Sequence, residues 1–477
     1  MSEIGIKQAA LYNAMAKYGT MVVQLGLTMI LSRLILPEAF GVVAIITVIL
    51  GFLNLFADLG IGINIIQHPE MPKEDIDRLF TFCGVVGVVL ALCTIGLAYP
   101  LARFYKDDIY VGLCLMVSFV SLFHTFNVIP DAILRRDKKF KLIAFRSIIS
   151  SFVSGLIAVI LAWLDWGVYA LVSHSIISAL FLFAWNYSLN PLKFRSFRFK
   201  KIVRLLGRYS LFQILFNFMN YFTRNLDNLM IGKYFGVANL GYYNKSYHLY
   251  LYPNTIFASV LTGVLHPYIR DYKNNYPKMY EKYLQIEKML SVIGVFTMIV
   301  TFFCATEIVE LMFGANWKPA GLYLKCLSLC MWTQMMSAVS GSVFLGLERT
   351  DQTFKCGIIN LTLLIMSIFI GVFFNSLFLL ALCVGISYNL IFLITNHILL
   401  RKTMGLSVWH YLKQIAGDGL FAFSFVGATF LLPTISENII LSFVIKLSIC
   451  IIAYVLFILI SGQKELFLTT IKMVRKK

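Results

Sequence analysis

Continuously apolar runs recur along the chain, and several are long enough for a helix to cross a membrane. One run, FVIKLSICIIAYVLFILI (443–460), holds a single charged residue. In lipid the backbone groups have to bond within the spanning structure, so only helices and closed barrels cross a membrane. Barrel strands show short segments of alternating polarity, and these runs do not alternate. We therefore predict an all-α integral membrane protein.

The composition agrees with this fold class and sets the number of spans. The 477 residues are 59% hydrophobic and 13% charged, with a mean hydropathy of +0.80, whereas a soluble domain carries about 25% charged residues. The loops are too short to hold an inserted soluble domain. At about 20 apolar residues per span, we predict fourteen spans, near 15–35, 41–65, 79–100, 109–131, 142–163, 168–189, 209–232, 246–268, 285–305, 322–346, 356–374, 377–400, 415–433 and 439–461.

The distribution of Lys and Arg predicts the orientation of these spans. Of the 41 cationic residues, 32 fall in alternate segments that begin with the N-terminus, and seven fall at the opposite ends. Cationic loops stay on the cytoplasmic side. We therefore predict that both termini are cytoplasmic, in a plasma or inner membrane. The net charge of +18 reflects this topology, and we expect no nucleic-acid partner.

The N-terminus and the cysteines set two further expectations. Residues 1–18 hold Lys7, Lys17 and a loose apolar period without a small-residue cleavage site. We therefore expect an interfacial helix leading into the first span rather than a cleavable signal. The nine Cys include no C-x-x-C pair, and the closest two are Cys326 and Cys330. Membrane packing is favoured over a disulfide or a metal site, so we predict no metal and no cofactor.

An internal repeat divides the chain. SRLILPEAFG (32–41) matches GKYFGVANLG (232–241), and FYKDDIYVGL (104–113) matches FGANWKPAGL (313–322). RRDKKFK (135–141) then matches RTDQTFK (349–355), so the offsets run from 200 to 214. Three matches in the same order predict two six-helix lobes in parallel repeat, related by a pseudo-twofold axis along the membrane normal.

This repeat predicts four regions. They are an N-terminal lobe (1–189), a basic linker (190–204), a C-terminal lobe (205–402) and two added helices with a basic cytoplasmic tail (403–477). In the linker, NPLKFRSFRFKKIVR, cations alternate with phenyl groups, a pattern that suits the headgroup layer. The linker is either a structural in-plane segment or a collector of an anionic lipid substrate.

The seventh span carries the chemistry least expected in a membrane. Arg224, Asn225, Asp227 and Asn228 lie within it, and an intramembrane charge costs about 3 kcal/mol on insertion scales. Residues three apart lie near one another on a helix, and the equivalent first-lobe positions hold no charge. These four side chains either line a cleft and hold a polar substrate or a coupling ion, or form a salt bridge that locks the helix in place.

A second polar cluster lies in the inner half of the second span. Asn54 and Asp58 are four residues apart and precede Gly60 and Gly62, which allow close helix approach or a break. Asp58, with Asn54, either binds a coupling cation such as Na⁺ or H⁺ or caps and pairs locally. The glycines lie at membrane depth without a preceding strand, so they are not a nucleotide loop.

The chain contains no P-loop, zinc motif or nucleophile elbow. Any transport would therefore be driven by an ion gradient, the membrane potential or the substrate gradient. The tyrosines between positions 234 and 252 either form an aromatic belt at the membrane interface or stack on sugars.

Several stretches together resemble one family. LSRLILPEAFGVVAIITVILGFLNLFADLGIG, RRDKKFK, RNLDNLMIGKYFGVANLGYYNKSY and LMFGANWKPAG resemble the polysaccharide flippases of the multidrug/oligosaccharidyl-lipid/polysaccharide (MOP) exporter superfamily, in the branch of lipopolysaccharide and teichuronic-acid exporters. The resemblance covers roughly residues 10 to 410. It implies a V-shaped pair of six-helix lobes with a cleft that opens to alternate faces.

The resemblance also implies a substrate and partners. The family moves undecaprenyl-pyrophosphate-linked oligosaccharide units from the cytoplasmic to the outer leaflet, and cationic cleft residues hold the pyrophosphate. Arg224 and Arg33 are the candidates for that role in this chain. Membrane lipids and a polysaccharide polymerase or export machinery are the expected partners.

Two other functions compete with this one. A drug/cation antiporter of the same fold would need an acidic, apolar cavity, and Arg224 argues against it. A membrane enzyme such as a polysaccharide polymerase or ligase would be expected to carry a large outer loop with catalytic residues. No predicted outer loop is that long, so we predict a transporter rather than an enzyme.

Overall fold

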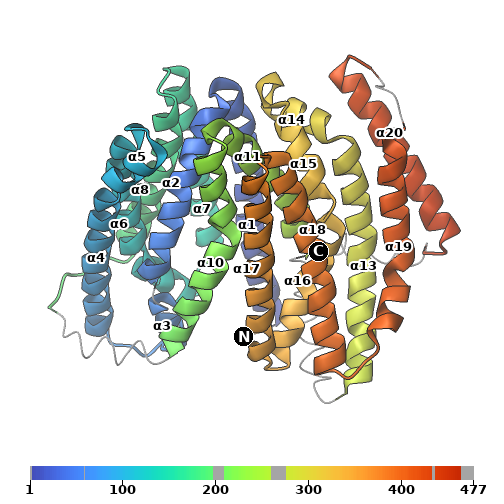
Figure 1. The fold of residues 1–477 in the computed structure, drawn as a ribbon. Helices are drawn as coiled ribbons and strands as arrows, with labels where there is room; N and C mark the ends of the chain where they lie inside the picture. The colour runs from blue at the N-terminus through green and yellow to red at the C-terminus, as the bar shows by residue number, and fades with distance from the viewer. Residues whose placement is uncertain (1–2, 59, 197–208, 259–274, 432–435, 464–477) are drawn as a thin grey trace. The chain divides into compact units, whose positions relative to one another are not determined.

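A computed structural model describes residues 3–58, 60–196, 209–258, 275–431 and 436–463. These residues form helices and the turns between them, and no strand occurs among them. The chain divides into two compact units, Met1–Gly241 and Tyr242–Lys477 (Figure 1). The predicted class, an all-α protein of many spans, is confirmed.

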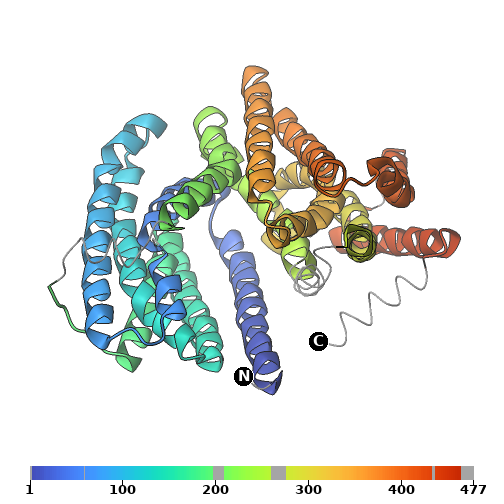
Figure 2. The ribbon, with the colours of Figure 1, turned by 90° about the horizontal axis from the view of Figure 1, so that it is seen from below.

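The first unit is a bundle of long helices. Within it α1 packs along α7, α4 and α8 pack on α6, and α10 packs on α2; its long helices run side by side in both views (Figure 1 and Figure 2). Its helices are α1 (Glu3–Leu34), α2 (Pro37–Asp58), α3 (Ile61–Gln67), α4 (Lys73–Gly96), α5 (Ala98–Tyr105), α6 (Ile109–Arg136), α7 (Phe140–Trp163), α8 (Val168–Leu189), α10 (Tyr209–Tyr234) and the start of α11 (Val237–Pro253).

The second unit has the same helical character. Here α17 packs on α18, while α13 packs on both α16 and α19, and α14 packs on α20. After the rest of α11, its α-helices are α13 (Tyr276–Phe303), α14 (Ala305–Phe313), α15 (Ala320–Ser328), α16 (Met331–Gly346), α17 (Thr350–Phe373), α18 (Leu377–His397), α19 (Val408–Thr429) and α20 (Ile439–Ile460).

Ten helices of the described residues are long and apolar enough to cross a membrane. They cover predicted spans one to six, nine, eleven, twelve and fourteen. At the other four predicted spans the structure has α10, α11, the α15–α16 pair and α19. The total of fourteen stays a prediction, since α10 carries the polar segment and α15 and α16 are each short.

Large apolar side chains are exposed on the surface of these helices. Leu92 of α4 is 62% exposed, Phe369 of α17 is 67% exposed and Ile452 of α20 is 61% exposed. Large apolar patches on a soluble monomer are rare, whereas such side chains face lipid at no cost. The protein is therefore a multi-pass membrane protein.

The N-terminal helix leads directly into the first predicted span. α1 runs without a break from Glu3 to Leu34, and an interfacial position of its first part stays a prediction. No proline interrupts this stretch, and its Ala, Leu and Met residues are good helix formers. The first span therefore continues the N-terminal segment as one helix.

The predicted inner ends of the first unit lie together. One cavity joins the first turns of α1 to the turn between α6 and α7, and a second joins α3 to the last turns of α6. At the other end, the Tyr105 hydroxyl of α5 donates to the Leu229 carbonyl of α10 at 3.2 Å. Figure 1 accordingly shows α3 and the N-terminus at one end of this unit and α5 at the other. Which end faces the cytoplasm stays a prediction.

The equivalent long helix is interrupted in each of the two repeats. In the first repeat, α4 ends before Leu97 and α5 continues to Tyr105, where Lys106 adopts φ 59°. In the second, α13 ends before Cys304 and α14 continues to Phe313, where Gly314 adopts φ 99°. A long helix, a short continuation and a positive-φ turn therefore recur at the second predicted match.

The first predicted match forms a reciprocal contact within the first unit. A Cβ placed on Gly41 of α2 would lie 2.7 Å from the carbonyl carbon of Val237, and one on Gly241 of α11 would lie 3.0 Å from that of Pro37. Each partner pair keeps the offset of 200 residues. The starts of α2 and α11 thus cross through two glycines with local twofold character.

The structure shifts the register of the third match. Lys138, with φ 57°, precedes α7, and Glu348, with φ 59°, precedes α17, so these junctions are 210 residues apart. The offset of 214 instead aligned Arg135, in the last turn of α6, with Arg349, the N-cap of α17. Similar charged residues flank both junctions. The sequence alignment is therefore shifted by about one helical turn from the alignment of the two backbones.

Candidate functional site

The polar segment of α10 is held in a fixed rotation against α2. The Tyr221 hydroxyl donates to the Val48 carbonyl oxygen at 2.5 Å. A Cβ on Gly51 would lie 2.9 Å from the ring of Tyr221, so a glycine leaves the room that this ring needs. The rotation of α10 then decides which of its polar side chains face outward.

Arg224 and Asp227 differ in exposure although they are three residues apart on this helix. Arg224 is exposed, while Asp227 and Asn228 are 7% and 5% exposed. The Asp227 Oδ1 accepts from the backbone N–H of Asn228 at 2.8 Å, and the Asn225 amide donates to the Tyr221 carbonyl at 2.8 Å. Positions three apart are still offset by about 60° around a helix, enough to separate an exposed from a buried side chain.

Among the residues that the structure describes, Arg224 and Asp227 do not form a direct ion pair. The salt-bridge alternative therefore has no support from this pair. The guanidinium of Arg224 is accessible, whereas the Asp227 carboxylate and the Asn228 amide are buried. A planar donor fork of this kind suits phosphate oxygens. Its role in binding substrate stays a prediction.

The end of α10 beyond this segment is fixed by α5. Besides the Tyr105–Leu229 bond, the ammonium of Lys233 donates to the Phe104 carbonyl and lies 4.1 Å from the centre of the Phe104 ring. Arg33, the other predicted phosphate ligand, is exposed in the last turn of α1. Arg33 thus comes from a different helix of the same unit.

The predicted coupling-ion residues both precede a break in the second span. Asn54 is half-buried, and its Oδ1 has no hydrogen-bond partner among the described residues. Asp58 is the last residue of α2, and its side chain lies outside what the structure describes. Gly60 then adopts φ 74° before α3 begins, so of the two alternatives at these glycines the structure has the helix break. The ion-binding role of Asn54 and Asp58 stays a prediction.

Sequence reasoning missed a buried cation in the first unit. Arg146 of α7 is 2% exposed and pairs with Asp131 of α6, whose other oxygen lies 2.6 Å from the Arg135 Nε. The Nε and Nη1 atoms of Arg146 have no hydrogen-bond partner among the described residues. Asp131 and Arg135 also line a cavity of about 320 Å³ beside α3. Asp131 and Arg135 are four residues apart on one helix, a spacing that could have indicated their own ion pair but not the one with Arg146.

Buried acids of the second unit are also partnered. Lys446, predicted within a span, pairs with Glu307 of α14 at 2.5 Å, and Ser442 donates to the same Glu307 oxygen at 2.8 Å. Glu287 of α13 is fully buried and accepts from the Tyr411 hydroxyl at 2.9 Å. An intramembrane charge is tolerated where a partner lies on a neighbouring helix, as Lys446 illustrates.

The tyrosines of α11 pack inside the second unit. Tyr243 and Tyr250 are 0% and 2% exposed, and the hydroxyls of Tyr247 and Tyr388 lie 3.0 Å apart. The rings of Tyr243 and Tyr247 stack on one another. This part of the predicted tyrosine cluster is an interior layer rather than an aromatic belt.

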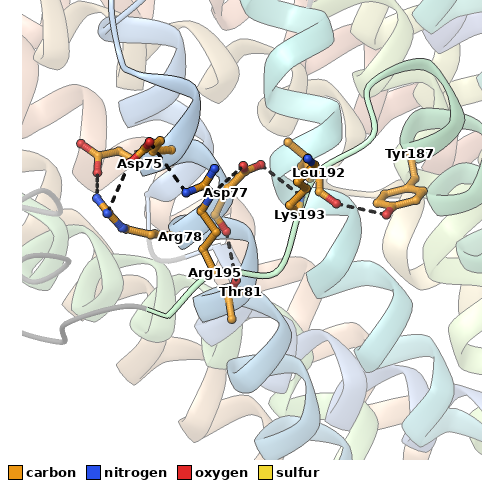
Figure 3. Close-up of polar contacts among 9 residues, drawn as sticks. Asp75, Asp77, Arg78, Thr81, Tyr187, Leu192, Lys193 and Arg195 are labelled. Atoms are coloured by element: carbon orange, nitrogen blue, oxygen red, sulfur yellow. Dashed lines mark hydrogen bonds and ion pairs between the residues drawn. The ribbon is translucent and has the colours of Figure 1, made fainter.

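The first part of the linker is bound to the start of α4 (Figure 3). Asp77 is 2% exposed and accepts from the backbone N–H of Lys193 at 3.1 Å, while the Arg195 N–H donates to Thr81 at 2.8 Å. The Arg195 guanidinium lies 3.4 Å from the other Asp77 oxygen. The structural alternative therefore fits residues 190–196. Residues 197–204, on which the lipid-collecting alternative also depends, lie outside the described residues.

The geometry gives no metal centre in the described part of the chain, where no group of three or more His, Cys, Asp or Glu side chains could hold an ion.

The sequence profile described as "Polysaccharide biosynthesis protein" matches residues 30–321. The chain belongs to this polysaccharide biosynthesis family. The resemblance read from the sequence motifs is thereby confirmed.

Two curated relatives carry related names. This family member is 24% identical over 320 residues to the succinoglycan biosynthesis transport protein ExoT of Rhizobium meliloti (strain 1021), covering 67% of this chain and 64% of ExoT. It is 22% identical over 308 residues to the teichuronic acid biosynthesis protein TuaB of Bacillus subtilis (strain 168), covering 64% and 63%. The chain thus spans just under two thirds of the length of these relatives.

Solved structures share the fold of this family member. The lipid II flippase MurJ in an inward closed conformation superposes with a TM-score of 0.76 at 16% identity, over 96% of this chain and 99% of MurJ. An inward-facing multidrug resistance MATE family transporter of the MOP superfamily reaches 0.58 at 18% identity, over 86% and 95%. At these identities the likeness establishes the fold alone, in agreement with the predicted class.

Proposed function

We propose that this protein is a flippase for undecaprenyl-pyrophosphate-linked oligosaccharide units. It moves them from the cytoplasmic to the outer leaflet by alternating access, for the synthesis of a surface polysaccharide. Membership of the polysaccharide biosynthesis family carries this proposal. The names of ExoT and TuaB and the fold shared with a lipid II flippase point the same way.

The polar side chains of α10 suit the task of moving a charged headgroup through a membrane. A pyrophosphate-sugar headgroup cannot cross about 30 Å of hydrocarbon unaided, so it needs polar groups at membrane depth. The exposed Arg224 supplies a permanent charge with a planar donor fork, and Asp227 and Asn228 of the same helix are buried. In this proposal Arg224 binds the diphosphate, Asn225 adds a hydrogen bond, and Arg33 attracts the headgroup at the outer end.

The proposed transport is driven by a gradient or a potential. The chain contains no ATP-binding loop, so an ion gradient, the membrane potential or the substrate gradient drives transport. Asp58, Asn54 and Asp227 are the proposed sites for a coupling Na⁺ or H⁺. The buried Asn54 oxygen without a hydrogen-bond partner among the described residues is the kind of acceptor that a cation would use.

The proposed cellular setting follows from the charge distribution. The protein resides in the plasma or inner membrane with both termini in the cytoplasm, because its cationic loops alternate along the chain. Its partners are the lipid-linked oligosaccharide, the surrounding lipids and a polysaccharide polymerase or export machinery that takes up the translocated unit.

A drug/cation antiporter is the second candidate, because a multidrug resistance MATE transporter shares the fold. That activity is expected to need an acidic site facing an apolar cavity. In the first unit the exposed charge of α10 is instead a guanidinium. The flippase proposal therefore fits this helix better.

Deletion of the gene from its native host separates the two functions. A flippase predicts loss of surface polysaccharide and accumulation of the lipid-linked oligosaccharide on the cytoplasmic leaflet, both reversed by the wild-type gene. Unchanged polysaccharide together with increased sensitivity to cationic drugs would favour the antiporter and contradict the proposal.

A further inference from the structure

One cavity of the first unit has no lining residue from α10. It has a volume of about 890 Å³ and is bounded by the first turns of α1, the turn between α6 and α7, the start of α7 and the end of α8. Ala9, Tyr12, Phe140, Phe145 and Trp185 form its apolar walls. An apolar cavity of this size accepts a chain or ring of a ligand rather than water alone.

The entrance to this cavity is cationic. Lys138, Lys139 and Lys141 line it, all three are exposed, and its lining includes no acidic residue. The nearest acid in sequence, Asp137, pairs with Arg136 at 3.2 Å. Among the described residues Lys138, Lys139 and Lys141 form no ion pair, so their charges are not neutralised beside the cavity that they line.

The turn that carries these lysines is rigid. Lys138 adopts φ 57° after α6, its N–H donates to the Arg135 carbonyl at 3.1 Å, and the Lys139 N–H donates to the Leu134 carbonyl at 3.0 Å. This is the Schellman arrangement, in which the left-handed position usually holds glycine. The backbone therefore holds the lysines next to one another at a fixed point of the entrance.

Apolar walls behind a cationic entrance match an amphiphile with an anionic head. The predicted topology places this end at the cytoplasmic headgroup layer, where lysine stems extend toward phosphates and tryptophan and tyrosine are favoured. Basic pockets between membrane helices on this side bind phospholipid headgroups. A free inorganic anion would leave the apolar walls unused.

We propose that this cavity binds an anionic phospholipid of the cytoplasmic leaflet. Its phosphate lies among Lys138, Lys139 and Lys141, and an acyl chain packs against Phe145 and the neighbouring apolar walls. This inference does not rest on the flippase proposal, because lipid binding is measured on the purified protein without transport.

The chain supplies a matched pair of variants for the test. Lys106 is also an exposed lysine at a left-handed helix end, with φ 59°, and it does not line the cavity. Lys138→Gly and Lys106→Gly each remove one charge and relieve one left-handed backbone. Both are expected to raise the thermal midpoint in detergent to a similar extent. The double variant Lys139→Gln/Lys141→Gln tests the same site without touching either left-handed residue.

The measurement is the retention of phosphatidylglycerol by the purified protein in detergent, by native mass spectrometry and by the lipid-dependent rise in thermal midpoint. We expect wild type and Lys106→Gly to bind equally, Lys138→Gly to bind about fivefold more weakly, and the double variant to bind more weakly still. Equal retention of phosphatidylcholine, equal stabilisation by inorganic phosphate alone, or equal losses in Lys138→Gly and Lys106→Gly would each overturn the proposal.

Discussion

Replacing Gly41 by alanine tests the crossing of α2 and α11. The new Cβ would lie 2.7 Å from the carbonyl carbon of Val237, inside the 3.4 Å at which ordinary contact begins. The obstructing atoms belong to a backbone, so no rotamer change removes the clash, and the two helix starts have to move apart. Overpacking of this kind costs about 1–3 kcal/mol, and we take about 3 kcal/mol because the backbone itself is displaced.

The helix propensity of alanine offsets part of this cost. Exchange of glycine for alanine inside a helix gains about 1 kcal/mol, so Gly41→Ala should destabilise the protein by about 2 kcal/mol. Gly26→Ala in α1 is the matched control, because its Cβ would meet no atom within 4 Å. That variant should gain about 1 kcal/mol, which leaves a gap of about 3 kcal/mol between the two.

Thermal unfolding of the purified variants in one detergent measures this gap as a difference in midpoint. Gly241→Ala should resemble Gly41→Ala, since its Cβ would lie 3.0 Å from the carbonyl carbon of Pro37. The double variant should cost less than the sum of the two, because one separation of the helices accommodates both methyl groups. A midpoint for Gly41→Ala at or above that of Gly26→Ala would refute the reasoning.

Four further predictions concern the site, the linker, a buried ion pair and the topology. Arg224→Ala should abolish polysaccharide export at normal membrane abundance and Arg224→Lys should restore it in part; recovery of export in Arg224→Ala/Asp227→Ala would instead support a structural bridge. Asp77→Asn should weaken the attachment of the linker by about 1–3 kcal/mol and speed its cleavage by protease in membranes, and unchanged cleavage would contradict the anchoring. Glu307→Gln should cost about 3–5 kcal/mol by leaving Lys446 without this partner, and Glu307→Gln/Lys446→Met should recover most of it; a midpoint for the double variant no higher than for the single one would speak against the pair. Reporter fusions placed after positions 68, 140, 200, 275 and 405 should all report a cytoplasmic location. One reproducible external signal at any of them would refute the predicted topology.

The sequence predicted the parts of this fold that depend on local chemistry. Long apolar runs become membrane-length helices because the backbone has no other partner in lipid, and glycine marked the break before α3 through its positive φ at Gly60. The polysaccharide family also followed from motifs. The first repeat match is exact in the structure, because Gly41 and Gly241 are both required by the same close approach.

Pairings between helices could not be predicted in the same way. Arg146 and Asp131 are 15 residues apart on two helices, and Glu307 and Lys446 are 139 residues apart. Which cation neutralises which acid depends on helix rotation and packing, and no periodicity in the sequence encodes either. The same limit explains Arg224 and Asp227, where the helix spacing was read correctly and the exposure of each side chain depended on α2.

Transport itself is tested most directly in vesicles. Purified protein is reconstituted with a fluorescent polyprenyl-pyrophosphate oligosaccharide, and a membrane-impermeant glycosidase added outside cleaves the headgroups that reach the outer leaflet. The flippase account predicts that wild-type vesicles expose nearly all of the labelled lipid, whereas protein-free vesicles and Arg224→Ala vesicles expose only the share that began outside. Wild-type vesicles that expose no more than protein-free ones, under Na⁺ and H⁺ gradients of either direction, would contradict it.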